Sequence, residues 1–333
     1  MSKRLKDVGE SAVLRLARKI FTKSKIVVTG IGDDAAVLSI GGKFFAMTTD
    51  MFVGKTSIPQ IATPEQIGKK AVVINFSDLA AVGARPIALL FSIAMPADFE
   101  LSSVERIMRS MEKEARRYGA CVVGGDVDEG EDITIAGFAF GIVEGKILTR
   151  DRARPGELVG VTGELGSAAA GLDVIRRKLE EKRFEPLIRA QLEPEARCVE
   201  GIILGKCKGV TSAIDISDGF AYNLWQIAEE SGIGITVEKE KLPICSLVKE
   251  YSKSIGKDPY DFALFGGEDY ELLFTIKPSS LSELERKFKR ANRKFTIVGK
   301  TVRGRGVWIS EEGKVKRLPK IGFEHFRHNS QNL

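Results

Sequence analysis

Six short segments combine acidic residues with glycine or hydroxyl neighbours, and such residues bind hard cations and phosphates. They are Gly32-Asp33-Asp34, Thr48-Thr49-Asp50, Ser77-Asp78, Gly124-Gly125-Asp126, Asp215-Ile216-Ser217-Asp218-Gly219 and Gly266-Gly267-Glu268-Asp269-Tyr270. Most follow an apolar or small-residue run, where a strand or helix is expected to end. Carboxylates that share one cleft repel one another and are costly to bury unless a cation lies between them. Oxygen-only ligand sets favour magnesium over zinc or iron. The sequence therefore predicts a magnesium-dependent protein that acts on a phosphorylated ligand.

Single segments also have structural interpretations. An aspartate beside glycine or in a short polar segment, such as Asp34 or Asp50, is often a turn former. Asp78 differs because it lies in an apolar stretch of helical character, where burial with a partner is favoured over an N-cap. Asp215 and Asp218 are three residues apart and would share one face if their segment is helical. Turns do not readily explain so many acidic segments together.

Length and hydropathy favour a two-domain globular protein. At 333 residues the chain is long for one hydrophobic core, and its apolar share of 43% is ordinary. Charged residues or glycine interrupt the apolar stretches before they reach the ~18 residues of a membrane span. The N-terminus begins with positive charge but leads into no apolar region, so no signal peptide is expected.

The cysteines and histidines exclude several kinds of site. No two cysteines form a CxxC pair, which argues against a disulfide framework or zinc site and for a reducing cytoplasm; they are Cys121, Cys198, Cys207 and Cys245. Both histidines, His325 and His328, lie near the C-terminus. A HExxH zinc site is therefore excluded, and a Ser-His-Asp triad is not expected.

The net charge of +6 raises nucleic-acid binding as an alternative. The densest basic stretch covers residues 286–295, and Leu281, Leu284, Phe288 and Ala291 recur through it at helical spacing. This pattern is typical of a helix that packs an apolar stripe on the core and leaves a basic face in solvent.

Two segments resemble nucleotide-binding motifs, but neither is interpreted as one. Gly54-Lys55-Thr56 resembles the end of a P-loop, but Thr49 stands where that motif needs its first glycine. Residues 30–35 fit the dinucleotide pattern after a short apolar run. Two aspartates there would repel the pyrophosphate unless cations intervene, so the acids indicate metal instead.

Hydrophobic periodicity predicts alternating strands and helices, with a charged, proline-bearing link at 150–156 as the domain boundary. Thr63, Pro64 and Gln66 predict a helix start with an N-cap, a proline at N1 and a capping-box glutamine. The expected helices cover 10–21, 64 towards 78, 103–118, a stretch opened by 163–167 and one after 219. The expected strands cover 44–47, 87–94, 133–143, 158–162, 233–237 and 272–276.

The ordered set of motifs resembles the thiamine-monophosphate kinase family, within the superfamily that includes aminoimidazole ribonucleotide synthetase. The resemblance runs from about residue 9 to about residue 326. The matching pieces are Gly30-Ile31-Gly32-Asp33-Asp34-Ala35-Ala36, Thr48-Thr49-Asp50-Met51, Ser77-Asp78-Leu79-Ala80-Ala81, Gly124-Gly125-Asp126, Leu148-Thr149-Arg150, Val161-Thr162-Gly163, Asp215-Ile216-Ser217-Asp218-Gly219 and Gly266-Gly267-Glu268-Asp269-Tyr270-Glu271-Leu272.

The resemblance implies an α+β fold of two domains, 1–149 and 150–333, with the N-terminal sheet domain pairing into a homodimer. The implied reaction is ATP-dependent phosphorylation of thiamine phosphate to thiamine diphosphate by direct in-line transfer, with several Mg²⁺ ions. Transfer between phosphates needs positioning and charge neutralisation rather than a strong base, which suits a site without histidine. The implied partners are thiamine phosphate, ATP and a second copy of the chain, with no nucleic acid and no membrane.

The same resemblance assigns site residues. The implied metal ligands are Asp34, Thr48, Thr49, Asp50, Asp78, Asp126, Asp215 and Asp218. The implied nucleotide contacts are Gly125, Asp126, Arg150 and Ser217, and the implied substrate contacts are Glu268 and Phe323. Asp78, Arg150 and Asp218 are expected to act in catalysis. Ser57 stands where many family members carry a substrate-contacting histidine, and we expect Ser57, Lys55 or Thr56 to serve instead.

Sister enzymes and a non-catalytic RNA-binding protein are the alternatives. A selenophosphate synthetase would carry a reactive cysteine near its N-terminus, whereas the first cysteine here is Cys121. An aminoimidazole ribonucleotide synthetase leaves residues 266–272 unexplained, and a hydrogenase-maturation relative would end in a functional cysteine. A basic RNA-binding protein would leave the acidic segments unexplained, and salt-dependent RNA retention would identify it.

Overall fold

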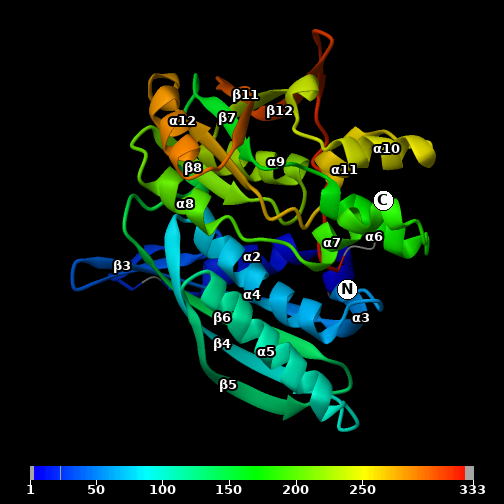
Figure 1. Ribbon diagram of the computed structural model, residues 1–333. Helices are drawn as coiled ribbons and strands as arrows, with labels where there is room; N and C mark the ends of the chain where they lie inside the picture. The colour runs from blue at the N-terminus through cyan, green and yellow to red at the C-terminus, as the bar shows by residue number, and fades with distance from the viewer. Residues whose placement is uncertain (1–3, 23, 327–333) are drawn as a thin grey trace.

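The computed structural model describes residues 4–22 and 24–326, which form two α+β units, each built on one sheet (Figure 1). The prediction of a two-domain α+β protein is confirmed; the boundary between residues 149 and 150 stays a prediction. The first unit contains α1 (Leu5–Val8), α2 (Glu10–Ile20), β1 (Val27–Thr29), β2 (Ala36–Ile40), β3 (Lys43–Val53), α3 (Gly54–Ser57), α4 (Pro64–Ala81), β4 (Ala84–Met95), α5 (Leu101–Arg117), β5 (Cys121–Glu129) and β6 (Thr134–Val143).

The second unit follows a short 3₁₀ turn at Arg150–Arg152. It contains β7 (Leu158–Thr162), α6 (Ser167–Arg176), α7 (Glu185–Leu192), α8 (Cys198–Gly205), β8 (Val210–Asp215), α9 (Phe220–Ser231), β9 (Gly234–Glu238), α10 (Ser246–Ser254), α11 (Pro259–Phe265), β10 (Leu272–Ile276), α12 (Leu281–Arg290), β11 (Phe295–Val302), β12 (Gly306–Glu311) and β13 (Lys314–Arg317). None of the helices in the described residues combines the length and apolar character needed to cross a bilayer.

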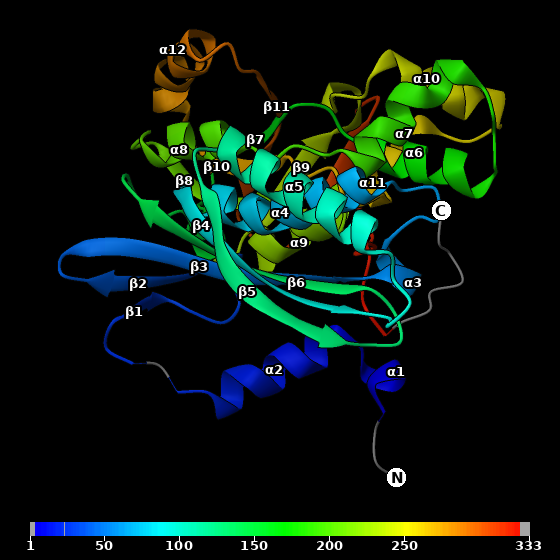
Figure 2. The same ribbon diagram turned by 60° about the horizontal axis from the view of Figure 1, so that its bottom comes forward.

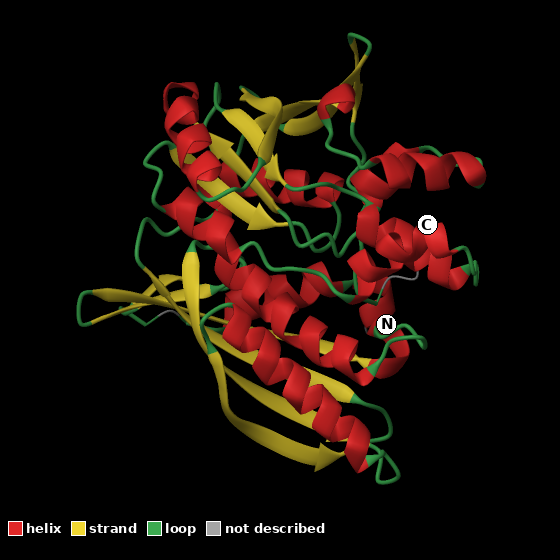
Figure 3. Cartoon of the chain, in the orientation of Figure 1, coloured by secondary structure: helices red, strands yellow, loops and turns green. Residues whose placement is uncertain are grey.

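The first sheet has the strand order β1-β2-β3-β6-β4-β5. Its strands β3 and β6 pair antiparallel from Phe44 to Val53, while β4 and β5 run parallel and are joined through α5. Helices α4 and α5 cover one face of this sheet (Figures 2 and 3), and α2 lies on the opposite side (Figure 2). The second sheet has the order β13-β12-β9-β11-β7-β10-β8, so β8 is an edge strand.

Helix α4 lies between the two units and is buried along most of its length. It begins as predicted, with Pro64 at N1. The Thr63 hydroxyl accepts a hydrogen bond from the Gln66 backbone N–H, and the Gln66 side-chain oxygen accepts one from the Thr63 backbone N–H. Its apolar residues from Ala71 to Ile74 point in all directions, which is typical of a helix buried on every side. One face packs on the first sheet and another contacts α8 and β8.

Most predicted elements are confirmed within a few residues, including α2, α5, β6, β7, β9 and β10. The basic stretch forms α12, whose Leu284 and Phe288 are buried, and the Phe288 ring lies 4.8 Å from that of Phe295. The predicted apolar stripe is therefore present.

One prediction about local structure is wrong, and two further acidic segments lie in elements that the sequence left open. The segment at 48–50 does not end a strand, because pairing with β6 carries β3 through to Val53. Residues 124–126 lie inside β5, an edge strand that, among the described strands, pairs with β4 alone. Asp215 and Asp218 do not share a helix: Asp215 ends β8, and Asp218 lies in the turn before α9. Gly219 has a φ of 115°, which breaks helical geometry there.

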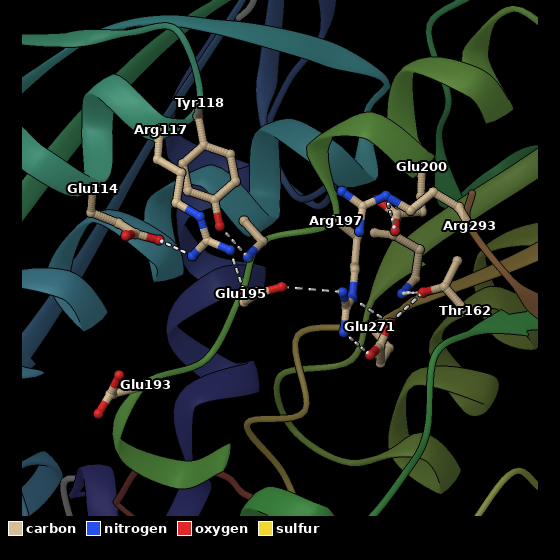
Figure 4. A network of polar contacts seen from close by, with 12 residues as sticks. Glu114, Arg117, Tyr118, Thr162, Glu193, Glu195, Arg197, Glu200, Glu271 and Arg293 are labelled. Carbon is tan, nitrogen blue, oxygen red and sulfur yellow. Dashed lines mark hydrogen bonds and ion pairs between the residues drawn. The ribbon is translucent and has the colours of Figure 1, made fainter. Parts of the chain in front are cut away.

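A network of ion pairs joins the two units beside α8 (Figure 4). Arg117, at the end of α5, bonds to Glu195 in the loop before α8. From the same loop, Arg197 donates to both carboxylate oxygens of Glu271, at 2.8 and 2.6 Å. The Thr162 hydroxyl donates to Glu271 at 2.6 Å. The network therefore fixes the start of β10, and the acidic segment before it, against the first unit.

Candidate active site at the junction of the two units

Carboxylates from three distant segments meet at the junction. Asp34 precedes β2, Asp78 lies in α4, and Asp215 ends β8. One oxygen atom from each of the three lies within 4.8 Å of the others. Asp34 and Asp215 are buried and Asp78 is half-buried. The acids that are scattered in the sequence therefore form one cluster, with members from both units.

Neutral hydroxyls hold the carboxylates of the cluster. The Thr48 hydroxyl, on β3, donates to Asp78 Oδ2 at 2.6 Å. The fully buried Ser77 donates from α4 to Asp215 Oδ2 at 2.6 Å. The prediction that Asp78 lies within a helix and has a partner is confirmed, but Asp78 is half-buried and lies in the last turn of α4 rather than mid-helix. Ser77 ties the second unit to the same helix.

Burial and mutual repulsion disfavour the charged forms of these acids. Burial raises the pKa of Asp78 well above its ordinary value, and the carboxylate of Asp215 raises it further. Burial, with a contribution from Asp34, raises the pKa of Asp215 to about 8. Burial also raises the pKa of Asp218 to about 7 and that of Asp33 to about 7. The site therefore needs more positive charge than the protein provides.

Arg150 supplies part of this positive charge. Its guanidinium contacts both oxygens of Asp34, with Nε 3.3 Å from Oδ2. Its backbone carbonyl accepts bonds from the Ser212 hydroxyl at 3.2 Å and the Ser231 hydroxyl at 2.8 Å. These contacts fix the 3₁₀ turn that carries Arg150 at the edge of the cluster.

The donor set fits magnesium. The ligand atoms around the cluster are carboxylate and hydroxyl oxygens, which Mg²⁺ prefers. Carboxyls that resist ionisation when no cation is present are the groups that a divalent cation would stabilise in their charged form. Asp34, Asp78 and Asp215 each have an oxygen placed closely enough to share such an ion, and the Thr48 hydroxyl bonds to Asp78 beside them.

The acidic residues at 268–271 have different roles. The Asp269 carboxylate accepts a bond from the Gly166 backbone N–H at 2.9 Å, at the N-terminal end of α6. Burial raises the pKa of Asp269 to about 8. Glu271 belongs to the ion-pair network at the unit junction, and its side chain is 3% exposed. Asp269 and Glu271 are therefore structural, which leaves Glu268, with a side chain 32% exposed, as the acid available to a ligand.

Both predicted substrate contacts on this side are tied to the turn after β8. The Glu268 backbone N–H donates to the Ser217 carbonyl at 2.8 Å, and the Phe323 N–H donates to the Asp218 carbonyl at 2.9 Å. Gly267 packs so closely that a Cβ there would lie 2.4 Å from the Ser217 carbonyl oxygen. The exposed Phe323 and the Glu268 loop therefore flank the same turn as Asp218.

Four predicted residues lie apart from the cluster. Side chains alternate along a strand, so Thr49 points to the face of the first sheet opposite Thr48 and Asp50. Gly125 and Asp126 lie on β5, which β6 and β4 separate from β3. Ser57 lies in α3, where its hydroxyl accepts a bond from the Val53 N–H at 3.5 Å.

Sequence reasoning missed three residues near the site. Asp33 accepts bonds from the Asp34 and Arg150 backbone N–H groups. Asn75, three residues before Asp78, accepts a bond from the Asp50 N–H at 3.0 Å. Lys70 contacts Glu268. The available signal for Asn75 and Lys70 was a polar side chain in the otherwise apolar helix α4.

Comparison with known proteins agrees with this architecture. Residues 32–143 match the family described as "AIR synthase related protein, N-terminal domain", and residues 154–309 match its C-terminal domain. The thiamine-monophosphate kinase of Pyrococcus horikoshii is 38% identical over 318 residues, 96% of each chain. The thiamine-monophosphate kinase of Aquifex aeolicus is 35% identical over 327 residues, 97% of this chain and 100% of the relative.

Solved structures give the same result. The structure described as "AaThiL complexed with AMPPCP and TMP" superposes with a TM-score of 0.88 at 34% identity, covering 98% of this chain and 99% of that one. The hydrogenase maturation protein HypE in complex with ATP, at 20% identity and a TM-score of 0.71, shares the fold. Sequence relatives, domain order and structure agree: the chain belongs to the thiamine-monophosphate kinase family of enzymes.

Proposed function

We propose that this enzyme transfers the γ-phosphoryl group of ATP directly to thiamine phosphate and forms thiamine diphosphate. The observation that carries the proposal is the cluster of Asp34, Asp78 and Asp215 at the junction of the two units, whose oxygen donors suit magnesium and phosphates. The family supports it, as does the similar structure that holds AMPPCP, an ATP analogue, together with TMP.

The proposed mechanism relies on positioning and charge. Mg²⁺, when bound, would offset the repulsion between the donor and acceptor phosphates. The carboxylates of the cluster would hold the ions, while Thr48 and Ser77 keep Asp78 and Asp215 oriented. Arg150 would stabilise charge on the transferring group. The acceptor phosphate is already ionised, so no side chain has to act as a strong base.

The proposed binding regions follow from the same geometry. Ser217 and Arg150 lie beside the cluster, where they would contact the nucleotide phosphates. Glu268 and Phe323 flank the Asp218 turn and would contact the thiamine end of the acceptor. Gly125, Asp126 and Ser57 lie outside this arrangement, and we assign their proposed contacts to the complete assembly with both substrates bound.

We also propose a homodimer that pairs through the first sheet. The face opposite α4 and α5 exposes large apolar side chains, including Leu90 at 40%, Val123 at 59% and Phe138 at 37%. Thr49 lies on this face beside Phe138. Pairing would cover these apolar side chains and place Thr49 at the shared surface. A cytoplasmic location accords with the four unpaired cysteines.

The test of this function is product identification. ATP and magnesium are incubated with the enzyme and, separately, with thiamine phosphate, free thiamine and unrelated phosphate monoesters, and products are identified by mass spectrometry. Thiamine phosphate alone should gain one phosphoryl group, with one ADP formed per product. Phosphorylation of free thiamine, or of the unrelated esters at the same rate, would contradict the proposal.

A further inference from the structure

Lys70 is a lysine buried inside α4. Its side chain is 5% exposed, and its Nζ lies 2.6 Å from Glu268 Oε1. The same Nζ donates to the Gln191 backbone carbonyl at 3.4 Å. Lysines are almost never buried unless they are paired. The partner here is an acid of the second unit, so the ion pair crosses the junction between the two units.

Gln191, at the end of α7, contacts the second oxygen of the Glu268 carboxylate. Its side-chain amide donates to Glu268 Oε2, and the residue is 2% exposed. Oε1 also accepts a bond from the Tyr270 hydroxyl at 3.5 Å, so Oε1 receives two protein donors and Oε2 receives one. A carboxylate oxygen has two acceptor sites, so a side chain that is 32% exposed retains capacity for a ligand donor.

The backbone around Glu268 is held in an uncommon conformation. Glu268 has a φ of 66° and Tyr270 a φ of 51°, in the left-handed region. Their N–H groups donate to Ser217 and Ile216 carbonyls, at 2.8 and 2.9 Å. Non-glycine residues occupy this region only when surrounding contacts impose it, and such residues gather at functional sites. Both the backbone and the carboxylate of Glu268 are therefore fixed in advance.

Helix α4 connects this carboxylate to the cluster. Lys70 precedes Asp78 by eight residues on the same buried helix, which corresponds to ~12 Å along its axis. Helix α4 therefore contributes Asp78 to the cluster and contacts Glu268 through Lys70. The spacing between the two sites is fixed by a helix rather than by a loop.

We propose that Lys70 and Gln191 are positioning residues, which hold the Glu268 carboxylate so that it receives the amine-bearing, cationic heterocyclic end of the acceptor. The inference rests on the proposed function. Lys70 and Gln191 do not touch the reacting phosphates, so they set the affinity for the acceptor and leave the transfer step to the cluster.

Steady-state kinetics of Lys70→Met test the proposal, with Lys69→Met as the matched control. Lys69 is the neighbouring residue on α4 and pairs with Glu193 at 3.6 Å rather than with Glu268. Loss of a hydrogen bond to a charged group should raise the KM for thiamine phosphate about 10-fold or more in Lys70→Met. The kcat and the KM for ATP should stay within about 3-fold. Lys70→Arg should restore most of the affinity.

A double-mutant cycle separates positioning from a merely structural role. The Kd for thiamine phosphate is measured by calorimetry for Lys70→Met, Glu268→Gln and the double variant. If Lys70 acts through Glu268, Lys70→Met should add almost nothing in the Glu268→Gln background. Additive losses would overturn the inference, as would an unchanged KM for thiamine phosphate in Lys70→Met or an equal rise in Lys69→Met.

The proposed function can fail separately from this inference. If the wild-type enzyme binds thiamine phosphate but transfers no phosphoryl group to it, only the proposed reaction is wrong, and the calorimetric cycle still decides the role of Lys70. If the wild-type enzyme does not bind thiamine phosphate, both proposals are overturned.

Discussion

Ser77 and Thr48 show how neutral residues prepare a charged site. Each hydroxyl donates a bond of 2.6 Å to one carboxylate of the cluster, so that Asp215 and Asp78 are oriented before any ion binds. The position of Asp78 was predictable, because an aspartate inside an apolar helix is a local signal. The separation of Thr49 from Thr48 was not, because it depends on which face of β3 packs against α4.

We predict that Asp78→Asn lowers kcat by at least ~100-fold, the loss expected when a catalytic electrostatic partner is removed. The fold should persist, because the change removes a charge from a cluster of like charges. Measurements of kcat at saturating magnesium and of the thermal midpoint check this. Asp98→Asn, an exposed position outside the cluster, should leave both values unchanged. Near-normal activity of Asp78→Asn would remove Asp78 from the site.

The raised pKa values predict how magnesium and pH act together on stability. Asp215 and Asp218 have folded-state pKa values of about 8 and about 7, above the ordinary 3.8. Their favourable contribution is complete below the ordinary pKa and is lost as the pH rises through the folded-state values. Mg²⁺ should therefore raise the thermal midpoint more at pH 8.5 than at pH 5, where protonated carboxyls bind it weakly.

Thermal unfolding with and without MgCl₂, at matched ionic strength from NaCl, measures this difference. A magnesium effect that is equal at both pH values, or larger at pH 5, would contradict the assignment of these carboxyls to a cation site.

Among the elements, α4 was the most predictable and β5 the least. The Thr63 cap and Pro64 mark the start of α4 in local sequence. The strand β5, Cys121–Glu129, contains two glycines and three acids, and only its pairing with β4 makes it a strand. Asp126 could therefore be identified as part of a motif, but its place on an exposed sheet edge could not be predicted.

The loop before α8 is predicted to hold the second unit in place. Arg197→Met would leave Glu271, which is 3% exposed, without its charged partner and should lower the free energy of unfolding by about 3 kcal/mol. Urea unfolding measures the change. Arg183→Met removes ion pairs from a side chain that is 51% exposed and should cost less than about 1 kcal/mol. Equal effects of the two changes would show that the Arg197 network does not stabilise the junction.

Across the whole molecule, the two-unit α+β organisation was predictable from the family resemblance. The strand orders and the position of α4 between the units were not, because pairings such as β3 with β6 join segments far apart in sequence. Hydrophobic periodicity reports which residues are buried but not which elements bury them. The cluster of Asp34, Asp78 and Asp215 depends on those long-range contacts.

The proposed dimer is tested by the oligomeric state of the protein in solution. Leu90→Glu, on the open face of the first sheet, should convert a dimer into a monomer in sedimentation velocity, because pairing would bury the introduced charge. Leu101→Glu, at the start of α5 where the side chain is already 82% exposed, should not change the oligomeric state. A monomeric wild-type protein, or a Leu90→Glu variant that remains a dimer, would contradict the proposed interface.

The most direct test of the central proposal is the fate of the γ-phosphoryl group. The enzyme is incubated with γ-labelled ATP, thiamine phosphate and magnesium, and the label is followed by mass spectrometry. We predict that label appears in thiamine diphosphate, one for each ADP, that none is bound to the protein, and that chelation of magnesium stops the reaction. Label released only as free phosphate, or retained on the protein as a phosphoenzyme, would contradict direct transfer.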